Sequence, residues 1–182
     1  ELQTERLVLR RFRPDDLDRL AAIQSLPEVA EFLYWEPRSR DQAAAALARY
    51  IAETRLAADD DAVTLAVIRR EDDLLLGTVT VWLRSVEHRQ AEVGYVFHPD
   101  AGGRGYATEA TRALIAFAFD DQELIASLPA PTPAQAIGRP PHPLNLRQEA
   151  HFREAEIFKG SWGDELVFAI LARKWSRSAD PT

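Results

Sequence analysis

The hydrophobic pattern of this chain changes period at residue 63, and that change limits the folds open to it. Three stretches after this point, 63–69, 75–83 and 90–97, alternate apolar side chains as half-buried strands do. Polar residues 70–73 leave room for only a short turn between the first two stretches. Strands joined by such turns run antiparallel. The sequence therefore predicts an antiparallel meander over residues 63–97.

Helical spacing dominates the chain on both sides of this meander. After a strand at 7–12, Pro14 and two aspartates open a helix over 14–25, because proline suits the first turn and acidic groups suit the positive end of the helix dipole. A second helix is predicted over 40–57, a third over 105–119, and a late strand over 165–171. Since helices and strands are segregated along the chain, we expect an α+β fold and not alternating βαβ units.

Length and composition exclude several classes of protein. The 182 residues fit a single domain, 1–182, with an ordinary 46% of hydrophobic residues. The net charge of -7 argues against nucleic acid as a partner, because phosphate binding needs clustered basic residues. The chain has no cysteine, so thiolate nucleophiles and zinc–thiolate sites are excluded and we expect no metal. Neither a membrane span nor a signal peptide is indicated, so we expect a cytoplasmic protein without a membrane partner.

A glycine-rich turn follows the last strand of the meander and leads into the third helix. Gly102, Gly103 and Gly105 would let several backbone N–H groups converge, and the helix N-terminus adds partial positive charge. A diphosphate group suits such a turn, and Arg104 can add a charged contact. On the glycines alone, a purely structural tight turn stays open. A Rossmann site is not supported, because Thr108 stands at the third glycine position and the preceding strands form a meander.

The run from Ala91 to Ala110 resembles the cofactor-binding motif of the GNAT acetyltransferases, which reads Gln or Arg, two residues, Gly, one residue, then Gly or Ala. The motif falls on residues 102–107, and Gly102 stands where Gln or Arg is usual, which we expect to weaken one phosphate contact without abolishing the site. Residues 4–10 and 162–168 resemble the branch that includes the ribosomal-protein N-terminal acetyltransferases. The resemblance implies a mostly antiparallel, mixed central sheet flanked by helices, in the order β-α-α-β-β-β-α-(β-α)-β-β.

The resemblance also implies acetyl-CoA as the cofactor and indicates where it would bind. The expected contacts are Tyr95, Val96 and Phe97, near which a backbone N–H polarises the thioester carbonyl, and Gly102, Gly103, Arg104, Gly105, Tyr106, Ala107 and Thr108. Glu92, on the same strand, is the candidate general base acting through water, with apolar neighbours expected to raise its pKa. The alternative for Glu92 is a solvent-facing strand residue or the partner of an arginine such as Arg89.

The acceptor groove is expected to use side chains of the first helical loop, the meander and a late hairpin. These candidates are Tyr34, Trp35, Trp82, Arg84, His88, Phe152 and Trp162. Each aromatic residue has the alternative role of capping the core. His88 lacks a serine and a carboxylate in a triad-like context, which argues against a hydrolase.

The predicted activity is direct transfer of acetyl from acetyl-CoA to a primary amine, either a protein N-terminus or a small-molecule amine. The partners are then the cofactor and the amine acceptor, and a homodimer is one candidate assembly. The alternative function is a non-catalytic acyl-CoA-binding or interaction protein with a decayed active site. The departure at Gly102 and an unusual stretch at 124–143 favour that alternative.

Residues 124–143 interrupt the family resemblance. Residues 124–138 carry no charged and no aromatic side chain, and six of the 11 prolines lie between Pro129 and Pro143. Two compensating frameshifts in the gene would explain this stretch, because one choice of synonymous codons for residues 124–130 reads His-Arg-Val-Thr-Ala-Arg in another frame, as in the family. If the written chain is genuine, we expect the strand after the third helix to survive poorly and the groove to be half unlined. If it is a reading error, the enzyme is complete.

Overall fold

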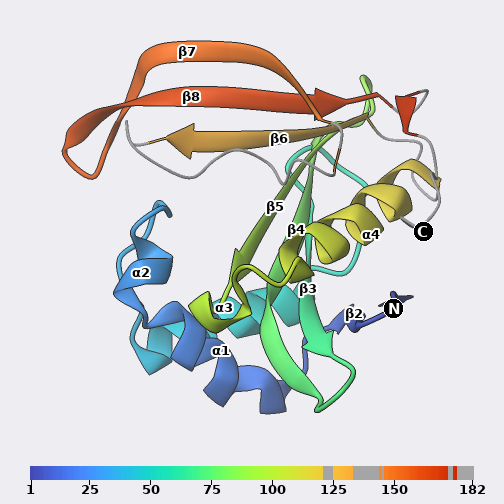
Figure 1. Ribbon diagram of the computed structural model, residues 1–182, viewed down its shortest axis with the longest axis vertical. Coiled ribbons are helices and arrows are strands. Elements are labelled where there is room, and N and C mark those ends of the chain that lie inside the picture. The colour runs from blue at the N-terminus through green and yellow to red at the C-terminus, as the bar shows by residue number, and fades with distance from the viewer. Residues whose placement is uncertain (121–124, 133–143, 145, 172–173, 176–182) are drawn as a thin grey trace.

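The chain forms one twisted sheet with helices on both faces (Figure 1). In the computed structural model, the described residues are 1–120, 125–132, 144, 146–171 and 174–175. The sheet has 8 strands in the order β1-β2-β3-β4-β5-β6-β8-β7. The β5–β6 pair is parallel, and all other strand pairs in the described part of the chain are antiparallel. This mostly antiparallel, mixed sheet with flanking helices confirms the predicted α+β class.

The strands divide into the meander and two flanking groups. The meander consists of β3 (Ala62–Arg69), β4 (Leu74–Ser85) and β5 (Gln90–Phe97), which pair antiparallel as predicted. On one side lie β2 (Leu7–Arg11) and β1 (Leu2–Gln3), and on the other β6 (Ile125–Thr132), β8 (Ser161–Ile170) and β7 (Arg147–Phe158).

The helices follow the predicted order with one addition. They are the 3-10 helices η1 (Pro14–Asp16) and η2 (Pro99–Ala101), and the α-helices α1 (Leu17–Gln24), α2 (Pro27–Ala30), α3 (Arg40–Ala52) and α4 (Tyr106–Asp120). The sequence pattern did not predict the single turn of α2. None of the helices in the described ranges is long and apolar enough to cross a membrane.

The helix predicted over 40–57 is wrong at its C-terminal end. It stops at Ala52, because Glu53 adopts an extended backbone with ψ of 97°. The carboxylate of Asp61 accepts the N–H groups of Ala57 and Ala58 at 2.7 and 2.8 Å, so these residues form a turn and not a helix.

Each face of the sheet has its own apolar core. On one face, Leu114 and Ile115 of α4 are fully buried and pack in the same cluster as Val79 of β4. On the other face, Leu20 of α1 and Leu47 of α3 belong to a second cluster with residues of β3. Because successive strand residues point to opposite faces, each strand of the meander contributes to both cores. The meander is thus fixed from both sides and can position groups at its ends.

β5 and β6 lie side by side only at their first residues and then diverge (Figure 1). Their pairing covers Gln90↔Ile125 to Glu92↔Ser127, whereas β6 continues to pair with β8 as far as Thr132. Two prolines, at 129 and 131, stand in the diverging part of β6. A proline has no N–H to donate, so a strand tolerates it where one edge has no partner. The divergence leaves a V-shaped opening between β5 and β6.

The strand β6 falls within the stretch that interrupts the family resemblance. The expectation that this strand survives poorly is wrong for residues 125–132, which pair with both β5 and β8. Residues 133–143, where the family places a further helix, lie outside the described residues. The frameshift explanation therefore stays a prediction.

Candidate functional site

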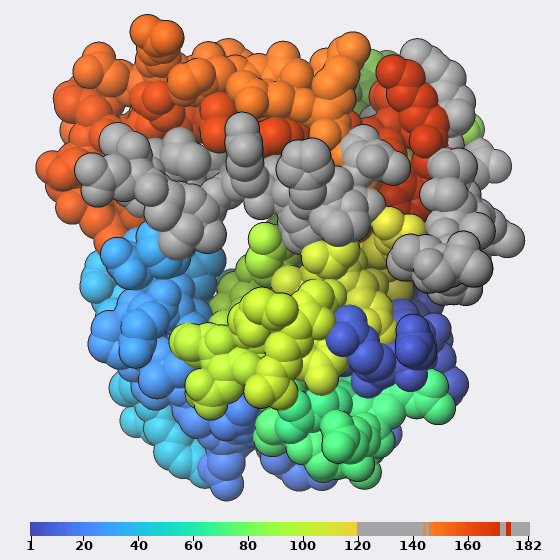
Figure 2. All heavy atoms as spheres, in the orientation of Figure 1, coloured from blue at the N-terminus to red at the C-terminus, as the bar shows by residue number. Residues whose placement is uncertain are grey.

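At the V-shaped opening, one edge of β5 has no strand partner among the residues that the structure describes. Residues 93–97 pair with β4 from Val81↔Val93 to Gly77↔Phe97, while within the described residues their pairing with β6 has already ended at Glu92. Figure 2 shows the molecule hollowed here, between the orange and red β7–β8 layer and the yellow-green start of α4. Strand backbone carries donors and acceptors at every residue. This edge can therefore bind an extended ligand through the opening.

The glycine-rich turn lies at the end of β5, on the wide side of the opening. Gly103 and Gly105 have φ angles of +70° and +77°, which other residues rarely adopt. A Cβ on Gly102 would lie 2.9 Å from the carbonyl oxygen of Pro99, so this position also favours glycine. Residues 102–105 are exposed, and α4 starts at Tyr106. An exposed helix N-terminus with a glycine turn before it can bind an anion through N–H groups that have no partner within the helix.

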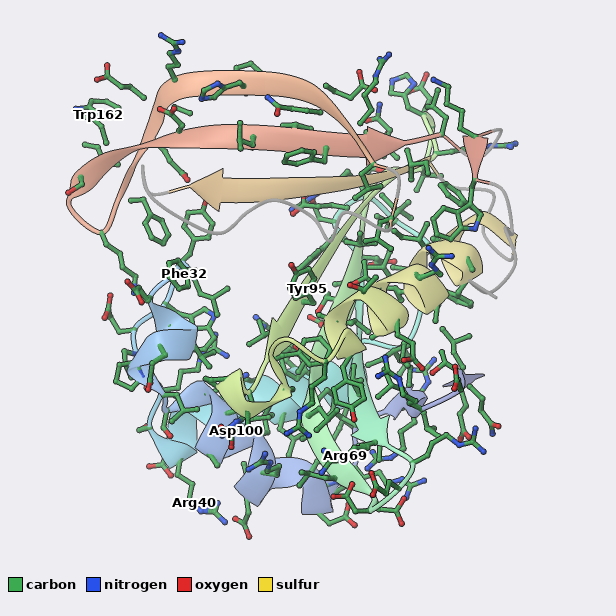
Figure 3. The ribbon with its side chains drawn as sticks, viewed as in Figure 1. Phe32, Arg40, Arg69, Tyr95, Asp100 and Trp162 are labelled. Atoms are coloured by element: carbon green, nitrogen blue, oxygen red, sulfur yellow. The ribbon has the colours of Figure 1, made fainter. Side chains whose placement is uncertain are left out.

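Tyr95, Val96 and Phe97 lie on β5 beside the opening, and Figure 3 shows Tyr95 there. The rings of Tyr95 and Phe97 are 6.1 Å apart and pack against the core on the α4 face. Val96 packs against the core on the opposite face. Burial raises the pKa of the Tyr95 phenol, which therefore stays protonated at neutral pH. These three residues thus offer a ligand mainly their backbone.

Tyr106 is the first residue of α4, and its side chain is only 8% exposed. The Arg6 guanidinium lies 4.7 Å from the Tyr106 ring centroid. Because the ring is buried, the predicted cofactor contact of Tyr106 would use its backbone N–H. Ala107 and Thr108 are partly buried in the same turn, and Arg104 is exposed.

Glu92 pairs with Trp82 across the β4–β5 ladder and is partly buried. Its carboxylate accepts a hydrogen bond from Arg84 Nε at 2.6 Å, and Arg84 also contacts Asp60 at 3.2 Å. The Arg84 guanidinium lies 5.9 Å from the Trp82 ring centroid. Glycine at position 94 leaves room for that ring, because a Cβ there would lie 3.0 Å from it. The strand neighbours of Glu92, Ala91 and Val93, are apolar and buried, as expected, but the carboxylate itself pairs with an arginine, which is the alternative considered for Glu92.

Tyr34, in the α2–α3 connection, meets the β7–β8 hairpin across the opening. The Tyr34 hydroxyl donates to Glu156 Oε1 at 2.5 Å, and its ring stands edge-on to Phe158 with centroids 5.4 Å apart. Lys159 Nζ, in the turn of the same hairpin, donates to the carbonyl of Ala30 at 2.9 Å. These contacts tie the α1–α3 side of the molecule to the hairpin and form one border of the opening.

Alongside burial, carboxylates on three strands, β5, β7 and β8, help to raise the pKa of Tyr34. Desolvation of its phenol, the hydrogen bond to Glu156, and the charges of Glu156, Glu165 and Glu92 together raise the pKa of Tyr34. The residue as a whole is 68% exposed, so the desolvation concerns its hydroxyl end against the hairpin. This border of the opening is therefore electronegative, and the Tyr34 hydroxyl stays protonated at neutral pH.

Of the other predicted acceptor residues, Trp35 contacts this border through its carbonyl, which accepts from Lys159 Nζ at 3.4 Å. Trp35 packs in the α1–α3 core, with the Arg38 guanidinium 4.4 Å from its ring centroid. His88 lies in the β4–β5 turn, next to the closed end of the opening. Phe152 and Trp162 are 53% and 60% exposed on the β7–β8 layer, and Figure 3 shows Trp162 away from the opening.

Sequence reasoning missed Glu156, Glu165 and the Arg6–Glu109 pair described below. Each depends on contacts between segments far apart in the chain. Arg6, Glu109 and Glu165 lie in segments that resemble the family, but the resemblance gave them no role. A separate pocket lined by residues 52–55 and 60–62 lies at the end of α3, and it contains no predicted site residue. We therefore place the candidate site at the V-shaped opening.

The chain matches known proteins over most of its length. A family model described as Acetyltransferase (GNAT) domain matches residues 6–147. The uncharacterized N-acetyltransferase p20 of Bacillus licheniformis is 29% identical over 177 residues, which cover 96% of this chain and 98% of that protein. YdaF of Bacillus subtilis, provisionally named a ribosomal N-acetyltransferase, is 26% identical over 180 residues, which cover 94% of each protein.

A solved structure shares the fold. The spermidine N-acetyltransferase of Vibrio cholerae, in complex with CoA and spermine, matches with a TM-score of 0.74 and 19% identity, over 94% of this chain and 98% of that one. The sequence matches and the shared fold agree. The chain belongs to the GNAT family of acetyl-CoA-using N-acetyltransferases.

Proposed function

We propose that this N-acetyltransferase binds acetyl-CoA in the V-shaped opening and transfers the acetyl group directly to a primary amine. The observation that carries the proposal is the exposed turn with two positive-φ glycines, at the N-terminus of α4 and beside the β5 edge that no other strand of the described ranges pairs with. A backbone cradle and a strand edge in one place suit a ligand with a diphosphate at one end and amides along its length.

The cofactor would make two kinds of contact. Its diphosphate would lie on the backbone N–H groups of residues 102–108, and the exposed Arg104 would add a charged hydrogen bond. The amides of its pantetheine arm would pair with the edge of residues 93–97, as an added strand does. A backbone N–H of this edge would then polarise the thioester carbonyl.

Glu92 is the proposed general base. It lies at the last β5 position that pairs with β6, where the opening begins. The hydrogen bond from Arg84 holds the carboxylate in one orientation at this point. From there it would accept the proton of the acceptor amine through a water molecule, while the sheet holds the reacting groups in place.

The acceptor would enter past the border formed by Tyr34 and the β7–β8 hairpin. A primary amine is cationic in neutral solution, and the carboxylates of Glu92, Glu156 and Glu165 would attract it. A protein N-terminus and a small-molecule amine both fit this chemistry. The provisional name of YdaF supports the first class, and the polyamine bound to the Vibrio cholerae enzyme supports the second.

Turnover tests the proposal. Free thiol released from acetyl-CoA should rise with at least one member of a panel of N-terminal peptides and polyamines, and the Glu92→Gln variant should lose most of this rate. Binding of acetyl-CoA by the wild-type protein without any thiol release would favour the non-catalytic alternative. Failure to bind CoA at all would refute the proposed site.

A further inference from the structure

The N-terminal segment of the chain contacts the first turn of α4. Thr4 Oγ1 donates to Glu109 Oε1 at 2.5 Å, and the backbone N–H of Arg6 donates to the same oxygen at 2.9 Å. The Arg6 side chain reaches the other carboxylate oxygen, with Nε at 2.7 Å. Glu109 in turn donates its backbone N–H to the carbonyl of Gly105 at 3.0 Å, the hydrogen bond that closes the first turn. One carboxylate therefore joins residues 4–6 to the start of the helix.

The Arg6 guanidinium also holds the glycine turn itself. Its Nη1 donates to the carbonyl of Arg104 at 2.9 Å, and its plane lies over the Tyr106 ring at 4.7 Å. A Cβ on Gly105 would lie 3.5 Å from Arg6 Nη2, so the guanidinium stands against the turn. Arg6 thus contacts the residues on both sides of Gly105, which has the left-handed backbone.

The ion pair has an electrostatic consequence for an anion bound at this helix end. Burial alone would raise the pKa of Glu109, but the hydrogen bonds from Thr4 and Arg6 outweigh it and lower the pKa, so Glu109 is charged at neutral pH. An uncompensated carboxylate in the first turn would repel a diphosphate. Arg6, at 2.7 Å from Glu109 Oε2, offsets that charge.

We propose that Arg6 is a positioning residue of the cofactor site, which fixes the turn at residues 104–106 and neutralises Glu109 so that the helix N-terminus can accept a diphosphate. This inference rests on the proposed function, because it assumes that CoA binds at the turn. It assigns a role to the Thr4–Arg10 segment, whose resemblance to the family carried no function by itself. A contact that only stabilises the fold would instead affect every ligand equally.

The experiment compares two ligands and a set of matched variants. CoA carries the diphosphate, whereas S-acetylpantetheine has the same reactive arm without it. Arg6→Ala and Arg6→Lys are compared with Arg70→Ala, since Arg70 Nη1 donates to the carbonyls of Thr4 and Glu5 at 3.0 and 3.2 Å and so holds the same segment through other contacts. The measurements are the Kd of CoA, the KM of S-acetylpantetheine and the Tm of each variant.

Arg6→Ala should weaken CoA binding about tenfold and leave the KM of S-acetylpantetheine within about twofold, because only the diphosphate contacts are lost. Arg6→Lys should keep part of the affinity by retaining the charge, and Arg70→Ala should bind CoA like the wild type. Adding Glu109→Gln to Arg6→Ala should recover part of the affinity, since the repelling charge is gone. A merely structural contact predicts no such recovery.

Three outcomes separate the proposals. If wild-type protein binds CoA and Arg6→Ala binds it equally well, the role of Arg6 is refuted and the proposed function stands. If Arg6→Ala loses both ligands in parallel with a fall in Tm, Arg6 is structural and the inference is also refuted. If the wild-type protein itself does not bind CoA, the proposed function fails first.

Discussion

The two ends of the candidate site are built in different ways. At the cofactor end, the expected contacts come from two segments close together in the chain, residues 93–97 and 102–108, and mainly from their backbone. At the acceptor end, the Tyr34 side chain contacts Glu156 of β7, and the charges of Glu165 on β8 and Glu92 on β5 also affect it. A backbone cradle tolerates side-chain change but not a change of backbone conformation. A side-chain border can change its ligand by single substitutions while the fold stays the same.

The largest effect should come from Gly105→Val, which would break the cofactor end. A β-branched residue is strained at the φ of +77°, and the turn must move to relieve it, so the amide cradle is lost. We expect CoA binding to weaken by more than about 100-fold, equivalent to two charge-assisted hydrogen bonds. Calorimetric titration of CoA measures this.

Gly160→Val is the matched control for that substitution. Gly160 has a φ of +84° in the β7–β8 turn, and a Cβ added there would have nothing within 4 Å, so the backbone strain is similar and the cradle is untouched. It should lower Tm and leave CoA affinity unchanged. Equal loss of CoA binding in both variants would show that strain, and not the cradle, explains the first result.

The next effect concerns catalysis where the two ends meet. Glu92→Gln should lower kcat about 100-fold, the usual contribution of a general base, with the Kd of acetyl-CoA unchanged. Asp60→Asn is the control, because Asp60 contacts Arg84 at 3.2 Å without touching Glu92. Should Glu92→Gln turn over at the wild-type rate, the base must be sought elsewhere.

A smaller effect is expected at the acceptor end alone. Glu156→Gln should raise the KM of a cationic acceptor about fivefold and leave the KM of acetyl-CoA unchanged, since an exposed carboxylate contributes modestly and is screened by salt. Tyr50→Phe removes a tyrosine hydroxyl on the α3 side of the fold that accepts from Gln24 at 3.4 Å, and it should change neither value. If Glu156→Gln raised the KM of the cationic acceptor and the KM of acetyl-CoA equally, the two ends of the site would not be distinct.

The smallest effect is a pH dependence of stability at the cofactor end. The pKa of Glu109 is lowered in the folded state, so its stabilising contribution is present above the unfolded value of about 4.3 and is lost as pH falls through the lower, folded-state value. The Tm difference between wild type and Glu109→Gln should therefore shrink as pH falls from about 6 to about 3. In an Arg6→Ala background this pH dependence should become smaller but persist in part, because the Thr4 hydroxyl and the backbone N–H of residue 6 still donate to the carboxylate. A pH dependence equal to that of the wild type would argue against the pairing.

The predictable parts of the molecule were those with a local pattern. The apolar stretches within residues 63–97 correctly placed three strands, because polar turns separate them and their side chains are buried against helices on both faces. The glycine-rich turn around Gly103 and the helix after it were likewise predicted from local sequence, and α4 begins one residue after its predicted start. Its role as a cofactor site stays a prediction.

The parts that escaped prediction depend on contacts between distant segments. Tyr34 and Glu156 are 122 residues apart, and Arg6 and Glu109 are 103 residues apart, so no window of sequence joins them. The alternative considered for Glu92 was pairing with an arginine such as Arg89, and the structure pairs it with Arg84, two residues along β4 from its cross-strand partner Trp82. An intact mass that matches the written sequence would exclude the frameshift proposed for residues 124–143.

The central claim is that the amides at the start of α4 hold the diphosphate of CoA. Backbone amide chemical shifts, followed by NMR during titration with CoA and with S-acetylpantetheine, test it most directly. We expect both ligands to shift the amides of residues 93–97 and only CoA to shift those of residues 103–108. CoA binding that leaves the amides of residues 103–108 unmoved would contradict the account.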